Sequence, residues 1–273
     1  CGWAFEDASN SGLVGFTFHG KGMYLLDSSA GNTSRLIEMD IATGKTRVII
    51  EDPHYDVGGI MMHPDTCKVQ AVSFMRDRIH RVIFDKAIRQ DFENIGKLDY
   101  GDFFLYDRDN KDTTWLVGFA KDNGPVSFYA YDRKKKKGTF LFDHKPDLKK
   151  YTLAPMEPIS FISRDGMAIH GYSTFPVGLA RKNLPLVLNV HGGPWTRDAW
   201  GYDPEAQWFS NRGYICLQVN FRGSSGYGKK FLNAGDKQLA GTMHNDLVDA
   251  VDWAVQNGFA DPERIAIYGG SYG

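Results

Sequence analysis

The 273-residue sequence predicts an all-β region followed by an α/β region, and two observations support this division. Up to about residue 150, short apolar and aromatic clusters alternate with turn residues, and no long helical period appears. Later in the chain, compact apolar runs alternate with helical segments, a pattern typical of a mainly parallel sheet. We therefore expect residues 1–152 and 153–273 to form different domains.

The first region repeats with a period in the mid-forties. Three of its strands end in an aspartate, Asp40, Asp85 and Asp132, at spacings of 45 and 47 residues. Turn residues follow the first and the third, as in Thr43-Gly44-Lys45. A period of this length with several strands per unit matches a β-propeller blade, with a β-sandwich of accidental spacing as the alternative. We expect about three blades, the C-terminal part of a propeller.

In the second region, the segment Arg164-Asp165-Gly166 between two apolar runs is a strong hairpin signal. Two amphipathic stretches predict helices that end at Gly213 and Gly258, and Asp261-Pro262 predicts a turn before the last strand. In chain order, the predicted strands and helices are 186–190, about 204–212, 215–219, 246–256 and 265–268.

Gly269-Gly270-Ser271-Tyr272-Gly273 follows the last strand directly. The pattern G-x-S-x-G is weak alone, but a nucleophile elbow requires a strand just before the serine and a helix just after it. At such a turn the serine hydroxyl is lifted clear of the sheet, and flanking glycines let the two backbones pass close together. The position therefore predicts an α/β-hydrolase domain with Ser271 as its nucleophile.

His191-Gly192-Gly193-Pro194 follows the first buried strand. Acyl transfer places negative charge on a carbonyl oxygen, and fixed backbone N–H groups must stabilise it. A glycine pair can direct an N–H group into a site because no Cβ blocks the approach. We expect the oxyanion hole to combine the N–H of Tyr272 with one N–H from this loop, to which Pro194 cannot contribute. An ordinary tight turn after a strand is the alternative.

Together with Asn220-Phe221-Arg222-Gly223-Ser224-Ser225-Gly226-Tyr227-Gly228, these two motifs resemble the prolyl oligopeptidase family of serine peptidases. The HGGP form is most similar to the acylaminoacyl-peptidase and bacterial oligopeptidase branch. The resemblance is dense from about Ser160 onward, while the first region agrees only in pattern. It implies a β-propeller followed by an α/β-hydrolase domain, with Ser271 as nucleophile and the backbone of Gly193 and Tyr272 as oxyanion donors.

The family takes its catalytic triad in the order Ser, Asp, His, and two residues follow Ser271 in the sequence. We therefore interpret the chain as truncated at both ends, expect its acid and base beyond Gly273, and expect the fragment to be inactive alone. None of the eight histidines is expected to be the base. His191 is expected to shape its loop, and His244 and Asp246 to belong to the start of a helix.

Arg222 is a candidate substrate contact with two readings. Its fork of donors is suited to hold a substrate carbonyl or carboxylate. It is equally suited to pin the glycine-rich loop to a buried carboxylate. The sequence leaves both readings open.

Composition excludes several classes of function. A net charge of -1 gives no reason to expect nucleic acid as a partner, and the basic run from Arg133 to Lys137 is interpreted as a solvated hairpin turn. No apolar stretch approaches the ~20 residues of a membrane span. Cys1, Cys67 and Cys216 have no metal-like spacing, so we expect isolated thiols, no metal and no cofactor. Compartment and oligomeric state stay open.

Three functions remain. The first is a serine peptidase that cleaves short peptides through an acyl-enzyme, with the propeller limiting access. The second is an esterase or lipase-like hydrolase, which shares the elbow and the oxyanion loop. The third is a non-catalytic propeller–hydrolase scaffold. Pro194, where many esterases carry a third glycine, and the preceding β region favour the peptidase. The peptide preference is not encoded in a recognisable motif.

Overall fold

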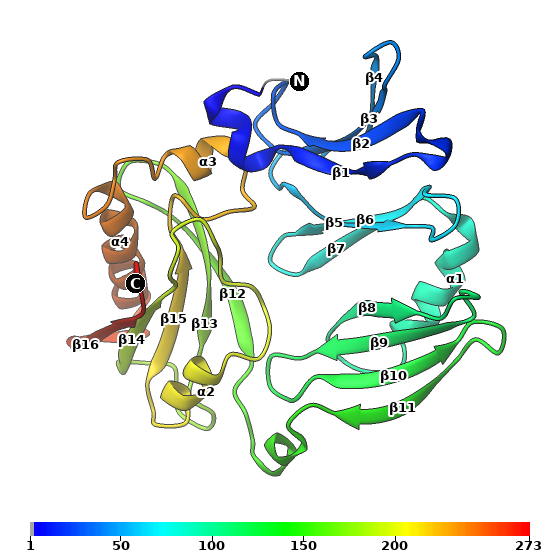
Figure 1. Cartoon of the computed structure of the whole chain (residues 1–273). Helices are drawn as coiled ribbons and strands as arrows, with labels where there is room; N and C mark the ends of the chain where they lie inside the picture. Colours follow the sequence, from blue (N-terminus) through cyan, green and yellow to red (C-terminus); the bar gives the residue numbers. More distant parts are fainter. Residues whose placement is uncertain (1–2) are drawn as a thin grey trace. The chain divides into compact units, whose positions relative to one another are not determined.

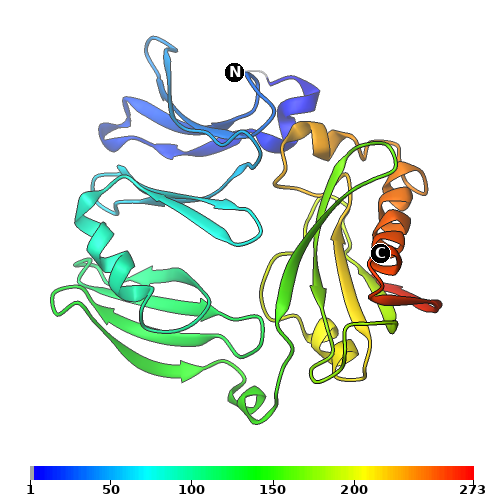
Figure 2. The same cartoon turned by 180° about the vertical axis from the view of Figure 1, so that it is seen from behind.

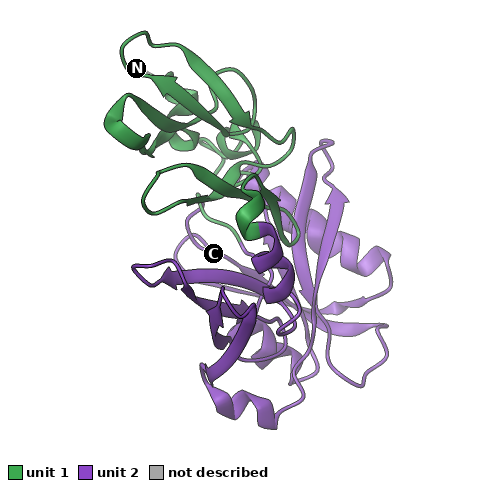
Figure 3. Ribbon diagram, turned by 90° about the vertical axis from the view of Figure 1, so that its right-hand side faces the viewer, with its two compact units in different colours: residues 1–88, 195–197, 222–239 green, residues 89–194, 198–221, 240–273 purple. Residues whose placement is uncertain are grey.

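The computed structural model describes residues 3–273, so Cys1 lies outside the described part of the chain. Cys67 and Cys216 are free thiols, as expected. The chain divides into two compact units (Figure 3). The first contains residues 1–88, 195–197 and 222–239, and the second contains residues 89–194, 198–221 and 240–273. The boundary expected between residues 152 and 153 stays a prediction.

The first unit contains a four-stranded antiparallel sheet, β1-β2-β3-β4, and a three-stranded one, β5-β6-β7 (Figure 1). Tyr24, Leu36, Val57, Val72 and Phe74 form their shared core, because alternate residues of each strand point to the same face. The strands are β1 (Gly12–Phe16), β2 (Gly22–Asp27), β3 (Arg35–Asp40), β4 (Thr46–Ile50), β5 (Val57–Met62), β6 (Val69–Met75) and β7 (Ile79–Ile83). The unit also holds the 3-10 helices η1 (Phe5–Asn10) and η2 (Phe18–Gly20) and the short helix α3 (Lys229–Asn233).

A third antiparallel sheet, in the second unit, has the order β11-β10-β9-β8. Its strands are β8 (Asp102–Arg108), β9 (Thr114–Ala120), β10 (Ser127–Asp132) and β11 (Lys137–Asp143), and the 3-10 helix η3 (Pro146–Lys150) follows. The three repeating aspartates have related local roles. Asp40 and Asp132 accept backbone N–H groups of the turn that follows, and Asp85 accepts the N–H of Ala87 at the start of a helix. Asp40 and Asp132 therefore share a strand-ending turn, whereas Asp85, which was expected to end a strand, lies two residues beyond β7 and belongs to the start of the helix.

That helix, α1 (Lys86–Ile95), corrects the expectation that the first region has no long helical period. Ile88, Phe92 and Ile95 are buried at helical spacing, and Phe92 contacts the rings of Phe103 and Trp115. A single ten-residue helix between strands is too short to dominate a periodicity scan.

The basic run forms the predicted hairpin turn between β10 and β11, but it is not simply solvated. Arg133 and Lys136 both form ion pairs with the buried carboxylate of Asp91 on α1. Arg133 also pairs with Asp112 and covers the ring of Trp115. Two of the cations therefore hold the turn against the helix.

The remaining strands form one five-stranded sheet with the order β12-β13-β15-β14-β16. The hairpin β12–β13 has the predicted turn, and β13 pairs antiparallel with β15. β14 pairs parallel with both β15 and β16, so the mainly parallel character expected for the sheet holds for these three strands and not for the hairpin. The strands are β12 (Met156–Ile162), β13 (Ala168–Thr174), β14 (Leu184–Val190), β15 (Ile215–Asn220) and β16 (Ala260–Gly269).

Two helices connect the parallel strands. In α2 (Pro204–Ser210), the carboxylate of Asp203 accepts the N–H of Ala206 at 2.7 Å as an N-cap, and Gly213 follows with a positive φ. α4 (Thr242–Gln256) begins four residues earlier than expected and runs alongside β16 (Figure 2). Among residues 3–273, no helix combines the length and apolar character that a membrane crossing requires.

The turn expected at Asp261-Pro262 lies inside β16, which corrects the predicted start of that strand. Leu184 pairs with Ala260 and Leu186 with Ile265, so the intervening residues of β16 bulge out of register. Asp261 accepts the N–H of Glu263 and the side chain of Arg264 there. The turn chemistry is real, but the strand pairing continues on both sides of it.

Candidate functional site

Ser271 lies immediately after β16, in a tight turn closed by a hydrogen bond from the N–H of Gly273 to the carbonyl of Gly270 at 3.1 Å. Its φ of 60° is in the left-handed region, which a non-glycine residue adopts at a cost of about 1–3 kcal/mol. The residue is exposed. The strand thus ends by presenting a strained serine at the surface of the second unit.

The glycines on either side of Ser271 are required by backbone contacts. A Cβ on Gly269 would lie 2.4 Å from the carbonyl carbon of Gly273. A Cβ on Gly273 would lie 2.0 Å from the carbonyl oxygen of Val190, the last residue of β14. The close passage of the two backbones that the sequence predicts is therefore present. It places the turn directly against the end of the neighbouring parallel strand β14.

The loop from His191 to Pro194 begins where β14 ends and reaches Ser271. A Cβ built on Gly192 would lie 3.4 Å from Cβ of Ser271 and 4.0 Å from its Oγ. Gly193 is exposed and has a φ of 117°. Within residues 3–273, neither the N–H of Gly193 nor that of Tyr272 donates a hydrogen bond. Both expected oxyanion donors are therefore available on segments that meet at the serine.

Three rings, His191, Phe221 and Tyr272, form what we call the ring stack. The centroids of His191 and Phe221 are 4.5 Å apart with an interplanar angle of 15°. Those of Phe221 and Tyr272 are 4.9 Å apart at 28°. Nδ1 of His191 also lies 2.7 Å from the carbonyl oxygen of Gly192. This arrangement supports the expectation that His191 shapes its loop.

Phe221 and Asn220 also lie at this site. Both belong to the motif from Asn220 to Gly228, in which the sequence gave them no role. Phe221 is fully buried directly after β15. Asn220 is also fully buried; its amide oxygen accepts the N–H of Asp198 at 2.7 Å, and its amide nitrogen donates to the Asp198 carbonyl at 3.0 Å. Their position could have indicated this, because the carboxyl ends of the parallel strands β15, β14 and β16 lie at the same edge of the sheet.

Within the described chain, Oγ of Ser271 makes no hydrogen bond, so no general base is assembled there. His244 is exposed on α4, whereas Asp246, two residues later, is fully buried. These two residues do not form a catalytic pair with Ser271. Burial raises the pKa of the Tyr272 phenol, and the nearby Asp246 carboxylate raises it further.

Arg222 is 5% exposed, and its carbonyl lies against the backbone around Gly235. It belongs to the first unit, while Ser271 belongs to the second. Its role as a substrate contact therefore stays a prediction.

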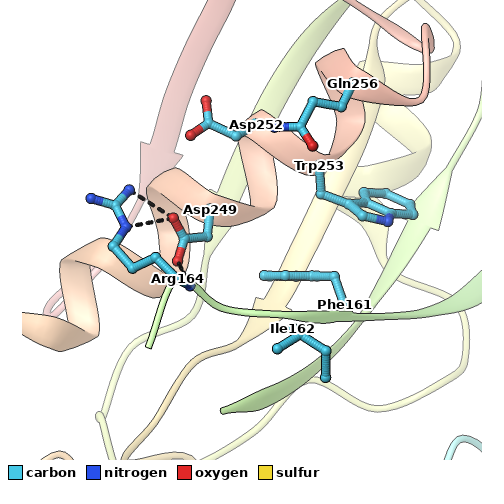
Figure 4. Close-up of a pocket in the computed structure, with 7 residues that line it drawn as sticks. All are labelled: Phe161, Ile162, Arg164, Asp249, Asp252, Trp253 and Gln256. Carbon is cyan, nitrogen blue, oxygen red and sulfur yellow. Dashed lines mark hydrogen bonds and ion pairs between the residues drawn. The ribbon is translucent and has the colours of Figure 1, made fainter. Parts of the chain in front are cut away.

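A hollow of about 680 Å³ in the second unit lies between the end of β12 and α4 (Figure 4). Arg164 donates to Asp249 through its N–H and its Nε, at 2.8 and 2.7 Å, and the rings of Phe161 and Trp253 stack at 6.2 Å. None of the elbow or oxyanion-loop residues lines it. In residues 3–273, no group of three potential metal ligands occurs.

Comparison with known proteins connects this geometry to one family. Residues 200–273 match the prolyl oligopeptidase family. The chain is 44% identical over 276 residues to dipeptidyl aminopeptidase BIII of Pseudoxanthomonas mexicana, covering 98% of the chain and 40% of that protein. It is 32% identical over 239 residues to dipeptidyl peptidase family member 6 of Caenorhabditis elegans, covering 80% of the chain and 32% of that protein. The similarity therefore extends into the first region, which contains none of the three motifs.

Solved structures agree in fold. Dipeptidyl peptidase 4 of Porphyromonas gingivalis superposes with a TM-score of 0.72 at 18% identity, over 95% of this chain and 37% of that one. Prolyl oligopeptidase B of Galerina marginata gives 0.74 at 16% identity, over 96% and 37%. The chain spans well under half the length of these relatives. In its motifs, its sequence matches and its fold, the chain is similar to the prolyl oligopeptidase family.

Proposed function

We propose that this chain carries the nucleophile and the oxyanion-binding groups of a serine peptidase that hydrolyses short peptides. The observation that carries the proposal is the convergence of three features at the end of β16. These are a strained, exposed Ser271, a loop in which a Cβ built on Gly192 would lie 4.0 Å from Oγ of Ser271, and two backbone N–H groups without partners in the described chain. Acyl transfer needs such a nucleophile next to such donors.

In the proposed reaction, Oγ of Ser271 attacks the scissile carbonyl carbon and gives up its proton to a general base. The carbonyl oxygen becomes an oxyanion that accepts hydrogen bonds from the N–H groups of Gly193 and Tyr272. Collapse of the tetrahedral intermediate breaks the C–N bond, the amine takes a proton, and the acyl group stays on Ser271. Water then attacks the acyl carbon and gives a proton to the base. The bond between that carbon and Oγ breaks, the carboxylic acid leaves, and Oγ of Ser271 regains its proton. Within residues 3–273, no general base is hydrogen-bonded to Ser271.

We further propose that the three antiparallel sheets in residues 1–152 are blades of a β-propeller and that residues 153–273 are part of an α/β-hydrolase domain. All three sheets consist of three or four antiparallel strands, and two of them share a strand-ending aspartate, Asp40 or Asp132, which supports this assignment. A propeller next to the site would restrict entry to short or extended peptides.

The substrate class we propose is peptides with a free N-terminus, from which dipeptides are released. Its support is the 44% identity with a dipeptidyl aminopeptidase, over nearly the whole chain. An esterase would share the elbow but would not require a free amine on its substrate.

The test uses the full-length protein and three reporters: a dipeptide amide with a free amine, its N-acetylated counterpart, and a simple acyl ester. We expect efficient turnover of the first, weak turnover of the second, and loss of all turnover in Ser271→Ala. Ser210→Ala is the matched control, because that hydroxyl donates only to the Gln207 carbonyl within α2 and its loss should leave activity intact. Preference for the ester over both amides would contradict the proposal.

A further inference from the structure

The ring stack connects both expected oxyanion donors to one buried side chain. The outer ring on one side, His191, lies two residues before Gly193 in the oxyanion loop. The outer ring on the other side belongs to Tyr272, whose own N–H is the second donor. Phe221 is the shared middle ring, and it is fully buried. The two donors come from different strand ends, and Phe221 is packed against both segments.

The residues that precede Phe221 hold its backbone in place. It follows Asn220, whose amide is bonded to both the N–H and the carbonyl of Asp198. Phe221 directly follows β15, which lies between β13 and β14 in the sheet and is paired with both. A ring held in this way can act as a spacer of fixed thickness between the segments that it contacts.

From this geometry we infer that Phe221 is a positioning residue that sets the separation of the Gly193 and Tyr272 N–H groups. The inference rests on the proposed peptidase function. Oxyanion donors act only when they lie about 2.7–3.1 Å from the developing charge. A displacement of about 1 Å in such a site can lower the rate by about 10²-fold. Loss of the middle ring should therefore impair the transition state more than it impairs binding of the ground state.

The experiment compares Phe221→Leu with Phe209→Leu in the full-length protein. Phe209 is a matched control because it is a buried phenylalanine of the same unit that packs on Val187, Ala206 and Cys216. We expect Phe221→Leu to lower kcat about 10- to 100-fold with little change in KM, and Phe209→Leu to lower thermal stability with kcat near wild type. Phe221→Tyr, which keeps the ring, should restore most of the rate.

A second readout separates positioning from general damage. A peptide trifluoromethyl ketone forms an adduct with the serine whose oxyanion occupies the hole, whereas a product dipeptide does not. In Phe221→Leu, the inhibition constant of the ketone should rise in step with the loss of kcat, and that of the dipeptide should stay constant. His191→Ala should lower kcat modestly, and combining it with Phe221→Leu should add less than the sum of the two effects.

If Phe221→Leu does not fold, Tyr272→Leu replaces it, because that change removes an outer ring and keeps the backbone N–H. The inference is overturned if the folded variant keeps its kcat, or if both inhibition constants rise equally. In these outcomes the wild-type enzyme is active and the proposed function stands. An inactive wild type with Ser271 unreactive would instead overturn the proposed function and this inference together.

Discussion

Backbone crowding explains why glycine is required at both ends of the elbow. The strand that ends at Gly269 and the residue Gly273 pass so closely that neither position has room for a Cβ. Ser271 between them adopts a conformation that most side chains avoid. The proposed nucleophile thus lies between two crowded positions that have room only for glycine.

The contact at Gly269 gives a prediction for a single methyl group. Gly269→Ala should abolish covalent labelling of Ser271 by a fluorophosphonate, because its Cβ would meet the backbone of Gly273 and open the turn. Gly270→Ala is the neighbouring control: a Cβ there meets nothing within 4 Å and φ is not positive, so labelling should persist. Equal labelling of both variants would show that the close passage is dispensable.

The ion pair between Asp7 and Lys229 gives a prediction for pH. A hydrogen bond from Lys229, 2.6 Å away, lowers the pKa of Asp7, and the interaction with Asp7 raises the pKa of Lys229. The contribution of Asp7 is therefore present above its unfolded pKa of about 3.9 and is lost as pH falls through its lower folded pKa. That of Lys229 is present below about 10.4 and is lost as pH rises through its higher folded pKa.

Asp7→Asn should accordingly lower the thermal midpoint at pH 6–8 and approach wild type in acid. Glu6→Gln is the control, since Glu6 is largely exposed and lies 3.6 Å from the same amine. Its midpoint should follow wild type at every pH. A constant Asp7→Asn deficit down to pH 2 would contradict the assignment.

The helix α1 and the β10–β11 turn depend on one another through a buried carboxylate. Asp91 is fully buried; it accepts the Tyr131 hydroxyl and pairs with Arg133 and Lys136. The side chains of Arg133 and Lys136 are 18% and 40% exposed, so water cannot fully replace the carboxylate as their partner. This small network joins α1 to β10 and to the β10–β11 turn of the third antiparallel sheet.

Asp91→Ala should therefore lower the free energy of opening of α1 by about 2–4 kcal/mol. The reason is that two cations and the Tyr131 hydroxyl lose their common partner. Hydrogen exchange of the α1 amides in the full-length protein measures this quantity. Asp147→Ala removes a fully solvated pair with Lys150 and should change it by less than about 0.5 kcal/mol. Similar effects of the two changes would show that the network is not the support of the helix.

Elements with a strong local signal could be predicted from the sequence. The continuous apolar runs of β14 and β15, the Asp-Gly hairpin and the elbow glycines all lie where their residues indicated. α1 was missed because three apolar residues at helical spacing in a ten-residue helix between strands give too short a pattern to stand out. The start of β16 was misplaced because Asp261-Pro262 has genuine turn chemistry within a bulged strand.

The site was predictable in its residue types and not in its supports. Ser271 and the glycine loop carry motifs, whereas Phe221 is an ordinary apolar residue whose role depends on two rings from distant parts of the chain. No local pattern records which ring packs against which. That information exists only after β14, β15 and β16 have aligned.

The compact units of the molecule cut across the order of its sequence. Residues 195–197 and 222–239 lie in the second region of the sequence but belong to the first unit. Arg197 donates to the carbonyl of Met75, and the N–H of Gly228 donates to the carboxylate of Asp56, whose pKa is raised by burial. A change of sequence pattern near residue 152 could not reveal these returns of the chain, because they depend on long-range polar contacts.

The proposed propeller predicts a limit on substrate size. In the full-length enzyme, peptides of rising length with one identical cleavable bond should show a steep fall of kcat/KM beyond some length, since only short or extended chains can enter an enclosed site. A folded, stable protein should resist cleavage. Digestion of such a protein at the rate of a short peptide would exclude a gating role for residues 1–152.

The account depends most directly on the chemical identity of the nucleophile. The decisive measurement is mass spectrometry of the full-length protein after reaction with a fluorophosphonate, with the modified residue located by peptide mapping. We expect one adduct per chain, located at Ser271, its absence in Ser271→Ala, and no adduct on the 273-residue chain alone, because no base contacts Ser271 within residues 3–273. An adduct on another serine, or equal labelling of wild type and Ser271→Ala, would contradict the assignment of this site.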